Sequence, residues 1–172
     1  MRALTLTQPW AGLVASGIKL IENRPRSIIK REDFGKRFAI HASRTIDMSV
    51  YARIAQIAPD VLMLDGDGSH VIPCLRYWPL LAEVTSAVIA VATVDKVFEG
   101  GWDSESIPLY ADEFSYSNGE KLGPSQVRWF FGPIGYVLRD VVALKRPIPC
   151  RGMLGFWTLP ADVERQVEEQ LR

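Results

Sequence analysis

The stretch from Gln8 to Arg26, QPWAGLVASGIKLIENRPR, constrains the fold most, because it begins with a helical pattern and ends with a strand pattern. Pro9 suits the first turn of a helix, where its missing N–H group is not needed, and Thr7 or Gln8 can cap that turn. Gly17 stands where a left-handed residue would end the helix. A single apolar stripe is formed by Trp10, Leu13 and Val14. The sequence therefore predicts a short helix that turns directly into a strand.

The strand half of this stretch carries an unusual density of charge. If Lys19 to Arg24 is extended, its side chains alternate between two faces. One face then carries Leu20, Glu22 and Arg24, and the other carries Lys19, Ile21 and Asn23. Burying three ionisable groups on a short strand is costly unless they pair with one another or contact a ligand. The segment is therefore a candidate site.

Lys19, Glu22 and Arg24 lead the candidate residues, and each has a plausible chemistry. Lys19 could bind a phosphate or, with its pKa lowered by burial, act as a base. Glu22 could accept a hydrogen bond from the amino edge of a nucleobase or orient Lys19, and Arg24 could clamp a phosphate or carboxylate. The structural alternative is that Glu22 pairs with Lys19 or Arg24 simply to fix the strand.

Gln8 and Trp10 are the next candidates. Trp10 fits a core anchor or a stacking platform for a base, and the Gln8 amide could cap the helix or read a base edge. His41 and Ser43 lie at the end of the strand predicted from Arg37 to Ala42, so they are candidates to contact a ligand oxygen at the same cavity. A nucleophilic Ser43 activated by His41 is the less favoured alternative, because no acidic partner lies nearby in sequence.

Arg151 and Gly152 lie between two prolines and a predicted closing strand. Gly152 would permit a close backbone approach, and Arg151 would then point at an anion bound there. The structural alternative is an ordinary tight turn. Cys150 lacks any sequence sign of the base partner that a nucleophilic thiol needs.

Positive charge is concentrated in two segments, although the net charge of the 172-residue chain is zero. Residues 19–44 contain eight basic and three acidic residues, and residues 128–152 contain five basic residues and one acidic residue. The intervening residues 45–127 contain four basic and twelve acidic residues. If the two basic segments meet when a barrel closes, they would form one positive face suited to RNA. Evenly solvated charge is the alternative.

The composition is that of one ordinary globular domain, with 48% apolar and 23% charged residues. No signal pattern and no apolar run of about 20 residues is present, so we expect a cytoplasmic protein without a membrane span. Cys74 and Cys150 are far apart, and only two histidines accompany them. We therefore expect reduced thiols, no metal site and no cofactor.

The remaining pattern predicts an α+β domain, a mixed β-barrel of five to seven strands with flanking helices. Insertions are expected at about residues 44–85 and 99–123. The second contains several aromatic residues, which could form a lid or a rim, or could simply pack the insertion against itself. Further helices are expected from Asp47 to Ala58, around Val61 to Leu64, from Pro124 to Phe131 and after Pro160. The expected strands are Arg2–Leu6, Lys19–Arg24, Arg37–Ala42, Ser86–Phe98, Gly135–Val142 and Gly155–Leu159.

These residues also resemble a known family. The opening pattern QPWAxLVxxGxKxxExR is similar to the signature of the ASCH domain, which belongs to the PUA-like superfamily of small mixed barrels. Other similar pieces follow in the expected order: IHAS at 40–43, SAVIAVATVDKV at 86–97, GPIGYVL at 132–138 and PIPCRGMLGFWTL at 147–159. The resemblance covers nearly all of residues 1–172 as a single ASCH/PUA-like domain. It implies binding of RNA or a modified nucleotide in a cleft at the barrel mouth, with a basic rim for phosphates.

Two other classes of function stay open. Some small ASCH proteins are amidohydrolases of acylated cytidine that use a lysine and a threonine spaced as in GxKxxT, and other relatives are linked to RNA cleavage. Gly17 and Lys19 match that spacing, but Glu22 occupies the threonine position and cannot supply the hydroxyl nucleophile. Glu22 as a general base with Lys19 as oxyanion stabiliser would be the hydrolytic alternative. A protein-interaction module is the third class, and no specific residue favours it.

Overall fold

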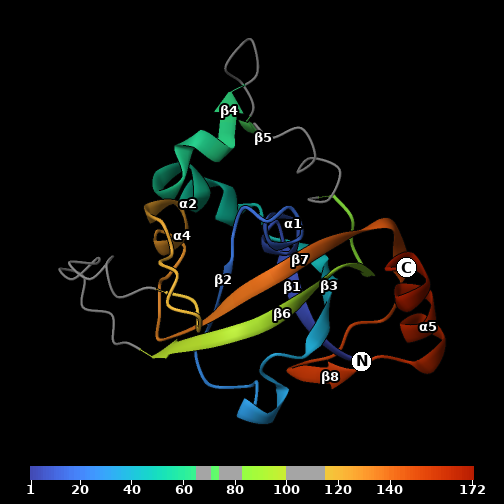
Figure 1. Ribbon diagram of the computed structural model, residues 1–172. Coiled ribbons are helices and arrows are strands. Elements are labelled where there is room, and N and C mark those ends of the chain that lie inside the picture. Colours follow the sequence, from blue (N-terminus) through green and yellow to red (C-terminus); the bar gives the residue numbers. More distant parts are fainter. Residues whose placement is uncertain (65–70, 74–82, 100–114) are drawn as a thin grey trace.

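A six-stranded mixed sheet forms the centre of the computed structural model, which describes residues 1–64, 71–73, 83–99 and 115–172 (Figure 1). The strands follow the spatial order β2-β7-β6-β3-β1-β8, in which β1 and β3 are parallel and every other pair is antiparallel. Their bounds are β1 Arg2–Gln8, β2 Ile21–Arg24, β3 Arg37–Ile46, β6 Ala87–Glu99, β7 Ile134–Pro149 and β8 Phe156–Thr158. The short strands β4 (Leu62–Leu64) and β5 (Val71–Pro73) pair separately.

Helices flank this sheet and none within the described residues is long and apolar enough to cross a membrane. The α-helices are α1 Trp10–Ala15, α2 Ser49–Ile57, α4 Pro124–Val127 and α5 Ala161–Gln170. Two 3₁₀ turns are η1 Arg31–Asp33 and η2 Pro59–Val61. The architecture is the α+β arrangement that the sequence predicts, with six strands within the expected range of five to seven.

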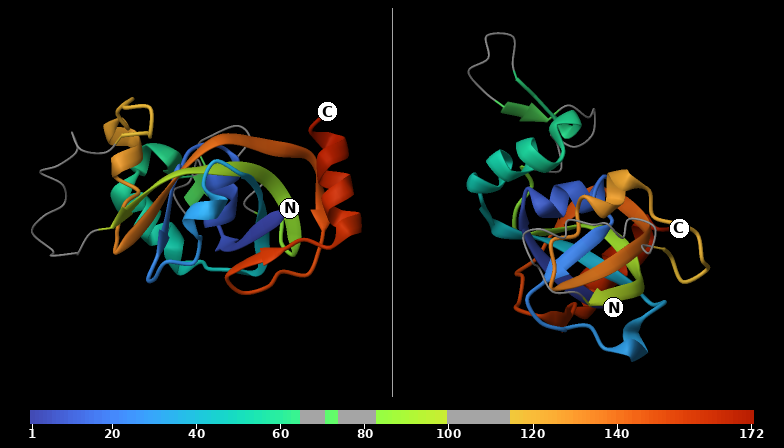
Figure 2. Two further views of the ribbon diagram at one scale, coloured as in Figure 1. Left: turned by 60° about the horizontal axis from the view of Figure 1, so that its bottom comes forward. Right: turned by 90° about the vertical axis from the view of Figure 1, so that its left-hand side faces the viewer.

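The two longest strands bend the sheet. β6 is rich in β-branched residues, as a central strand should be, and it pairs along almost its whole length with β7. The pairing is interrupted by three register shifts, and Asp140 adopts a positive φ of 50° within β7. Such irregularities sharpen the bend of a strand. The sheet therefore curls around a common interior, as Figure 2 shows in its right-hand view.

Alternation along the strands divides the apolar residues between two sides of the sheet. The curled interior is filled by Leu4, Leu6, Phe38, Ile40, Tyr136 and Leu138. The outer side near the chain ends is covered by α5, through Val163 and Val167, which pack with Ala3, Ala39 and Trp157. A third cluster lies under α1, α2 and α4 and includes Leu13, Ile54 and Trp129. Each helix therefore covers one part of the sheet.

The sheet curls like a barrel but does not close through strand pairing. Its edge strands are β2 and β8, and β8 pairs only with Arg2, Ala3 and Leu4 of β1. Beyond that point the edge of β1 faces the β2 side, where the Arg24 guanidinium donates to the Thr5 carbonyl oxygen at 3.0 Å. We call this junction between β2 and β1 the seam.

Several predicted boundaries need correction. Residues 62–64 form strand β4 rather than a helix, since only η2 precedes them, and α4 ends at Val127 instead of Phe131. β2 begins at Ile21 rather than Lys19, and β7 continues to Pro149. Asp47 does accept a hydrogen bond from the Ser49 N–H group at the start of α2. The predicted loops at residues 65–70, 74–82 and 100–114 lie outside the described residues, together with Cys74.

The pairing of β2 with β7 depends on the absence of a side chain at Gly135. A Cβ atom there would lie 2.5 Å from Cδ2 of Phe130 and 3.0 Å from Cγ2 of Ile21. We expect Gly135→Ala to lower the free energy of unfolding by about 2 kcal/mol, because the Phe130 ring must move. Urea unfolding would measure this. Gly123→Ala is the matched control, since its nearest neighbour would be 3.9 Å away, and equal stability of both variants would contradict the packing argument.

Candidate functional site

The end of α1 determines where Lys19 lies. Gly17 adopts a positive φ of 71°, and the N–H groups of Ile18 and Lys19 both donate to the Leu13 carbonyl oxygen, at 3.0 and 3.2 Å. This turn stops the helix and leaves Lys19 before the first residue of β2. The expected alternation, with Lys19 and Glu22 on opposite faces, is therefore wrong, because Lys19 is outside the strand and its side chain folds over to Glu22.

Lys19, Glu22 and Arg24 form one buried cluster, which we call the triad. Lys19 Nζ lies 2.9 Å from Glu22 Oε2 and also donates to the Ile21 carbonyl oxygen. Arg24 Nε lies 3.1 Å from Glu22 Oε1, while its terminal nitrogen reaches Thr5 across the seam. The side chains of Lys19 and Glu22 are 2% and 8% exposed, but that of Arg24 is 23% exposed. Solvent therefore reaches the triad mainly through Arg24.

The triad contains two cationic groups and one carboxylate. Burial lowers the pKa of Lys19, and the neighbouring Arg24 charge lowers it further, whereas Glu22 raises it. A single carboxylate cannot completely offset the buried charge of Lys19 and the partly exposed charge of Arg24, so the cluster favours either an added anion or loss of the Lys19 proton. Both outcomes have chemical uses, the first for binding a phosphate and the second for proton transfer.

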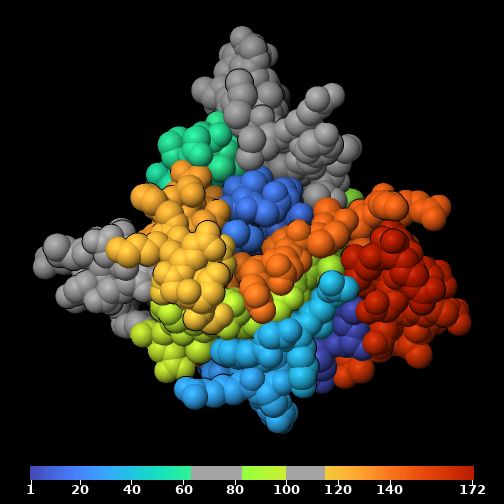
Figure 3. Space-filling view, in the orientation of Figure 1, coloured from blue at the N-terminus to red at the C-terminus, as the bar shows by residue number. Residues whose placement is uncertain are grey.

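Trp10 covers the triad from α1. Lys19 Nζ lies 5.5 Å from the centre of the Trp10 ring, which in turn packs against Trp129 and Phe131 at centroid distances of 6.3 and 5.7 Å. Figure 3 shows α1 at the surface beside the segment that contains α4 and the strand β7. Gln8 is fully buried, with its amide oxygen accepting from the Gly12 N–H group and its amide nitrogen donating to the Val84 carbonyl oxygen. The amide oxygen thus fixes the first turn of α1, and the amide nitrogen connects it to the segment before β6.

His41, Ser43, Arg151 and Gly152 form a second group on the outer side of the sheet. His41 Nε2 lies 2.9 Å from the Cys150 carbonyl oxygen, and a Cβ atom on Gly152 would lie 2.4 Å from Cε1 of the imidazole. The predicted close backbone approach at Gly152 is therefore made to His41. Ser43 exchanges hydrogen bonds with the Thr45 backbone, and Arg151 is exposed.

His41 is buried in a way that disfavours its charged form. Its ring packs edge-on against Trp157 at 5.8 Å, and Nδ1 is buried without a hydrogen-bond partner among the described residues. Burial lowers the pKa of His41, and the bond to the Cys150 carbonyl raises it by a smaller amount. Nothing in the described residues places a carboxylate on this ring, so the Ser43–His41 nucleophile gains no support.

Thr5 joins the two groups. Its carbonyl oxygen accepts from Arg24, its hydroxyl donates to the Met153 carbonyl oxygen at 2.9 Å, and the same hydroxyl accepts from the Trp157 indole. The predicted residues are thus divided into a triad and a His41 group, with Thr5 between them. Thr5 was not identified from the sequence because a threonine in an ordinary strand carries no distinguishing signal.

The two basic segments meet twice in the structure. β2 pairs with β7 from Ile21 opposite Val137 to Arg24 opposite Ile134, and His41 contacts Cys150 at the other end of β7. The two basic segments therefore lie side by side through the pairing of β2 with β7, and not through closure of a barrel. β1 also pairs with β8, as expected for the first and last strands.

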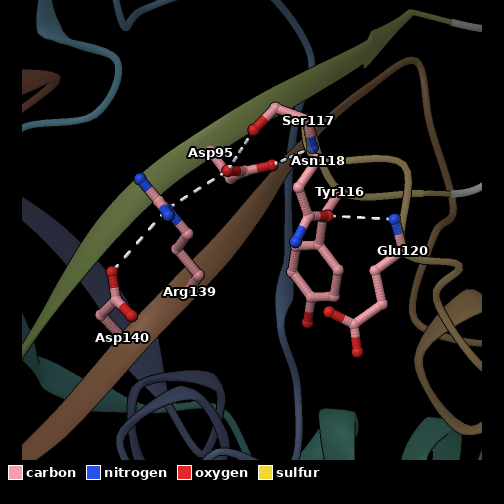
Figure 4. A pocket seen from close by; sticks show the side chains of 7 residues that line it. All are labelled: Asp95, Tyr116, Ser117, Asn118, Glu120, Arg139 and Asp140. Atoms are coloured by element: carbon pink, nitrogen blue, oxygen red, sulfur yellow. Dashed lines mark hydrogen bonds and ion pairs between the residues drawn. The ribbon is translucent and has the colours of Figure 1, made fainter.

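A separate hollow lies away from the triad and was not predicted (Figure 4). It encloses about 300 Å³ and is lined by Asp95, Tyr116, Ser117, Asn118, Glu120, Arg139 and Asp140. Asp95 accepts from Ser117 and pairs with Arg139 Nε at 3.2 Å. The described residues contain no group of three His, Cys, Asp or Glu side chains placed to hold a metal ion.

The chain is similar in structure to an ASCH protein from Zymomonas mobilis. The two share 16% sequence identity with a TM-score of 0.50, over 98% of this chain and 93% of the other. Two variants of the same protein also match at 16% identity, each with a TM-score of 0.49 and covering 98% of this chain; the shares of their own chains are 94% and 96%. No protein-family model and no curated protein matches the sequence. The fold is therefore that of the ASCH domain.

The triad makes a prediction about stability that depends on which charge is removed. Glu22→Gln leaves two cations facing each other, so it should lower the free energy of unfolding by about 3 kcal/mol. Lys19→Met leaves the pair of Glu22 and Arg24 intact and should cost only about 1 kcal/mol. Urea unfolding of both variants near neutral pH measures the difference. A larger loss for Lys19→Met would contradict the assigned charges.

The burial of His41 predicts a pH dependence. Because its pKa is below the usual 6.5 in the folded chain, the unfolded chain binds a proton at higher pH. Above about pH 6.5 His41 is neutral in both states, and its burial costs the folded chain nothing in protonation. Below that value the unfolded chain takes up a proton that the folded chain resists, so the free energy of unfolding falls. The free energy of unfolding should then decline more steeply on acidification in the unmodified protein than in His41→Gln. Parallel declines would show that His41 does not titrate this way.

Proposed function

We propose that this chain, which has the fold of an ASCH domain, binds RNA or a modified nucleotide at the seam, with Arg24 meeting a phosphate. The observation that carries the proposal is the excess positive charge of the triad, whose one partly exposed member is Arg24. A phosphate at Arg24 would offset that excess and accept from a planar donor group. The resemblance to ASCH proteins, which implies a nucleic-acid or nucleotide binder, supports the same conclusion.

The surroundings of the seam supply the other features such a ligand needs. Exposed cations lie on both basic segments, among them Arg26, Arg44 and Arg151, and they form the proposed rim for phosphates. Trp10 is partly exposed above Lys19 and is the proposed stacking surface for a base. In this proposal Gln8 positions Trp10 by bracing α1, and His41, Ser43 and Gly152 support the loop that carries Arg151.

A small hydrolase is the second candidate, favoured by one specific observation. Lys19 Nζ and Glu22 Oε2 are 2.9 Å apart, so a carboxylate and an ammonium group already face one another in a buried position. In this alternative Glu22 activates water and Lys19 stabilises the oxyanion during hydrolysis of an acylated cytidine, or assists cleavage of RNA. Because the Lys19 side chain is only 2% exposed, a substrate would first have to displace Trp10 or Arg24.

Binding to single-stranded RNA tests the first candidate. Arg24→Ala and Arg151→Ala should each weaken the affinity about fivefold and reduce the slope of log affinity against log salt by about one, since each removes a phosphate contact. Fluorescence anisotropy with a labelled oligonucleotide measures both quantities. Arg165→Ala is the matched control, because Arg165 is exposed on α5 and pairs with Glu169. Unchanged affinity in Arg24→Ala would reject binding at the seam.

Turnover of acylated cytidine or of RNA separates the two candidates. A binder should show no product with any of these substrates, whereas a hydrolase should show turnover that Lys19→Ala and Glu22→Gln abolish. Binding without turnover would exclude the second candidate under the conditions used. Turnover that survives both substitutions would assign the chemistry to other residues.

A further inference from the structure

The turn between β7 and β8 exposes two adjacent apolar side chains. Met153 is 58% exposed and Leu154 is 99% exposed. The other exposed large apolar residues among the described part of the chain are separate from one another or only partly exposed: Ile46 (41%), Met48 (70%) and Val142 (45%). A pair of apolar side chains held in water is a candidate contact surface, which we call the tip.

The backbone beneath the tip is fixed by several contacts. The Thr5 hydroxyl donates to the Met153 carbonyl oxygen, and His41 Nε2 bonds to the Cys150 carbonyl oxygen. The Cys150 N–H group donates to the Ser86 carbonyl oxygen at 3.0 Å, and Gly152 lies directly against the imidazole. Because the turn is already ordered, binding of a ligand to the tip would cost little conformational entropy of the turn.

Cations lie close to the tip along the chain or through hydrogen bonds. Thr5 bonds at the same time to Arg24, through its carbonyl, and to Met153, through its hydroxyl. Arg151 is exposed and stands two residues before Met153 in the chain. Arg44 lies next to Ser43, whose carbonyl oxygen accepts from the Ser86 N–H group, and Ser86 in turn bonds to Cys150. Basic residues of β2, of β3 and of the turn itself are therefore connected to the tip by short chains of hydrogen bonds or by sequence.

A partner for this surface must combine anionic groups with apolar faces at short spacing. Unpaired nucleotides have this combination, because each base offers a flat face beside a charged phosphate, whereas a duplex hides the base faces. We propose that Met153 and Leu154 pack against the face of an unpaired base while Arg24 and Arg151 contact the phosphates on either side. This inference rests on the proposed function and adds that the protein selects single-stranded over double-stranded RNA.

The test uses Leu154→Ser, which removes the apolar tip without disturbing packing because the side chain is 99% exposed. Met48→Ser is the matched control, an exposed apolar residue just before α2. The probes are a labelled RNA of about twelve nucleotides and the same sequence as a perfect duplex. Leu154→Ser should bind the single strand about tenfold more weakly with an unchanged salt slope, since no charge is lost. Met48→Ser should bind as the unmodified protein does, and duplex affinity should be equal in all three.

A second readout reports the base contact itself. With 2-aminopurine in the single strand, binding of the unmodified protein should change the fluorescence by altering base stacking, and Leu154→Ser should reduce that change at saturating protein. If Leu154→Ser binds as tightly as the unmodified protein while Arg24→Ala is impaired, the tip proposal falls and binding at the seam stands.

Other occupants of the tip would give different results. If the unmodified protein binds no RNA, both proposals fail. In that case loss of a dimer in sedimentation by Leu154→Ser would identify a second copy as the partner, and loss of binding to phosphatidylserine vesicles would identify a lipid surface. Either result overturns the assignment to an unpaired base.

Discussion

The arrangement of the site depends on the two ion pairs that the Glu22 carboxylate makes, one with Lys19 and one with Arg24. Taking two cations out of water is unfavourable, and the single buried anion between them reduces but does not cancel that cost. The cluster is stabilised because each oxygen of the Glu22 carboxylate pairs with one cation, and because Arg24 also donates to the backbone of β1. The result is a part of the interior that is better suited to receive negative charge than positive charge.

The same interaction explains how an open sheet can look like a barrel. β8 pairs with only three residues of β1, so among residues 1–64, 71–73, 83–99 and 115–172 no strand pairs with that edge of β1 beyond Leu4. Arg24 reaches that edge from β2 and supplies a side-chain donor where a closed barrel would have a backbone N–H group. At the seam the contact between the strands is made by the Arg24 side chain, not by backbone hydrogen bonds. A ligand could therefore bind the Arg24 guanidinium without breaking backbone hydrogen bonds between paired strands.

Much of the fold follows from local patterns, and the site follows in part. Gly17 ends α1 because its position demands a left-handed backbone, and the β-branched run of β6 requires a central strand. Glu22 and Arg24 share a face by simple alternation. The place of Lys19 depended on where the strand begins, which is two residues later than expected and which periodicity cannot resolve. The separation of His41 from the triad and the linking role of Thr5 arise from tertiary packing, which leaves no local sequence signal.

The position of β1 between β3 and β8 has a consequence for how the molecule is assembled. The first strand of the sheet lies beside residues 37–46 on one edge, but it finds its other neighbour only at Phe156–Thr158. Contacts separated by some 150 residues close slowly, because a long loop of chain must lose its freedom before they form. During synthesis, therefore, one edge of β1 remains unpaired until residues 156–158 have also emerged from the ribosome, and until then that edge is exposed to pairing with other strands.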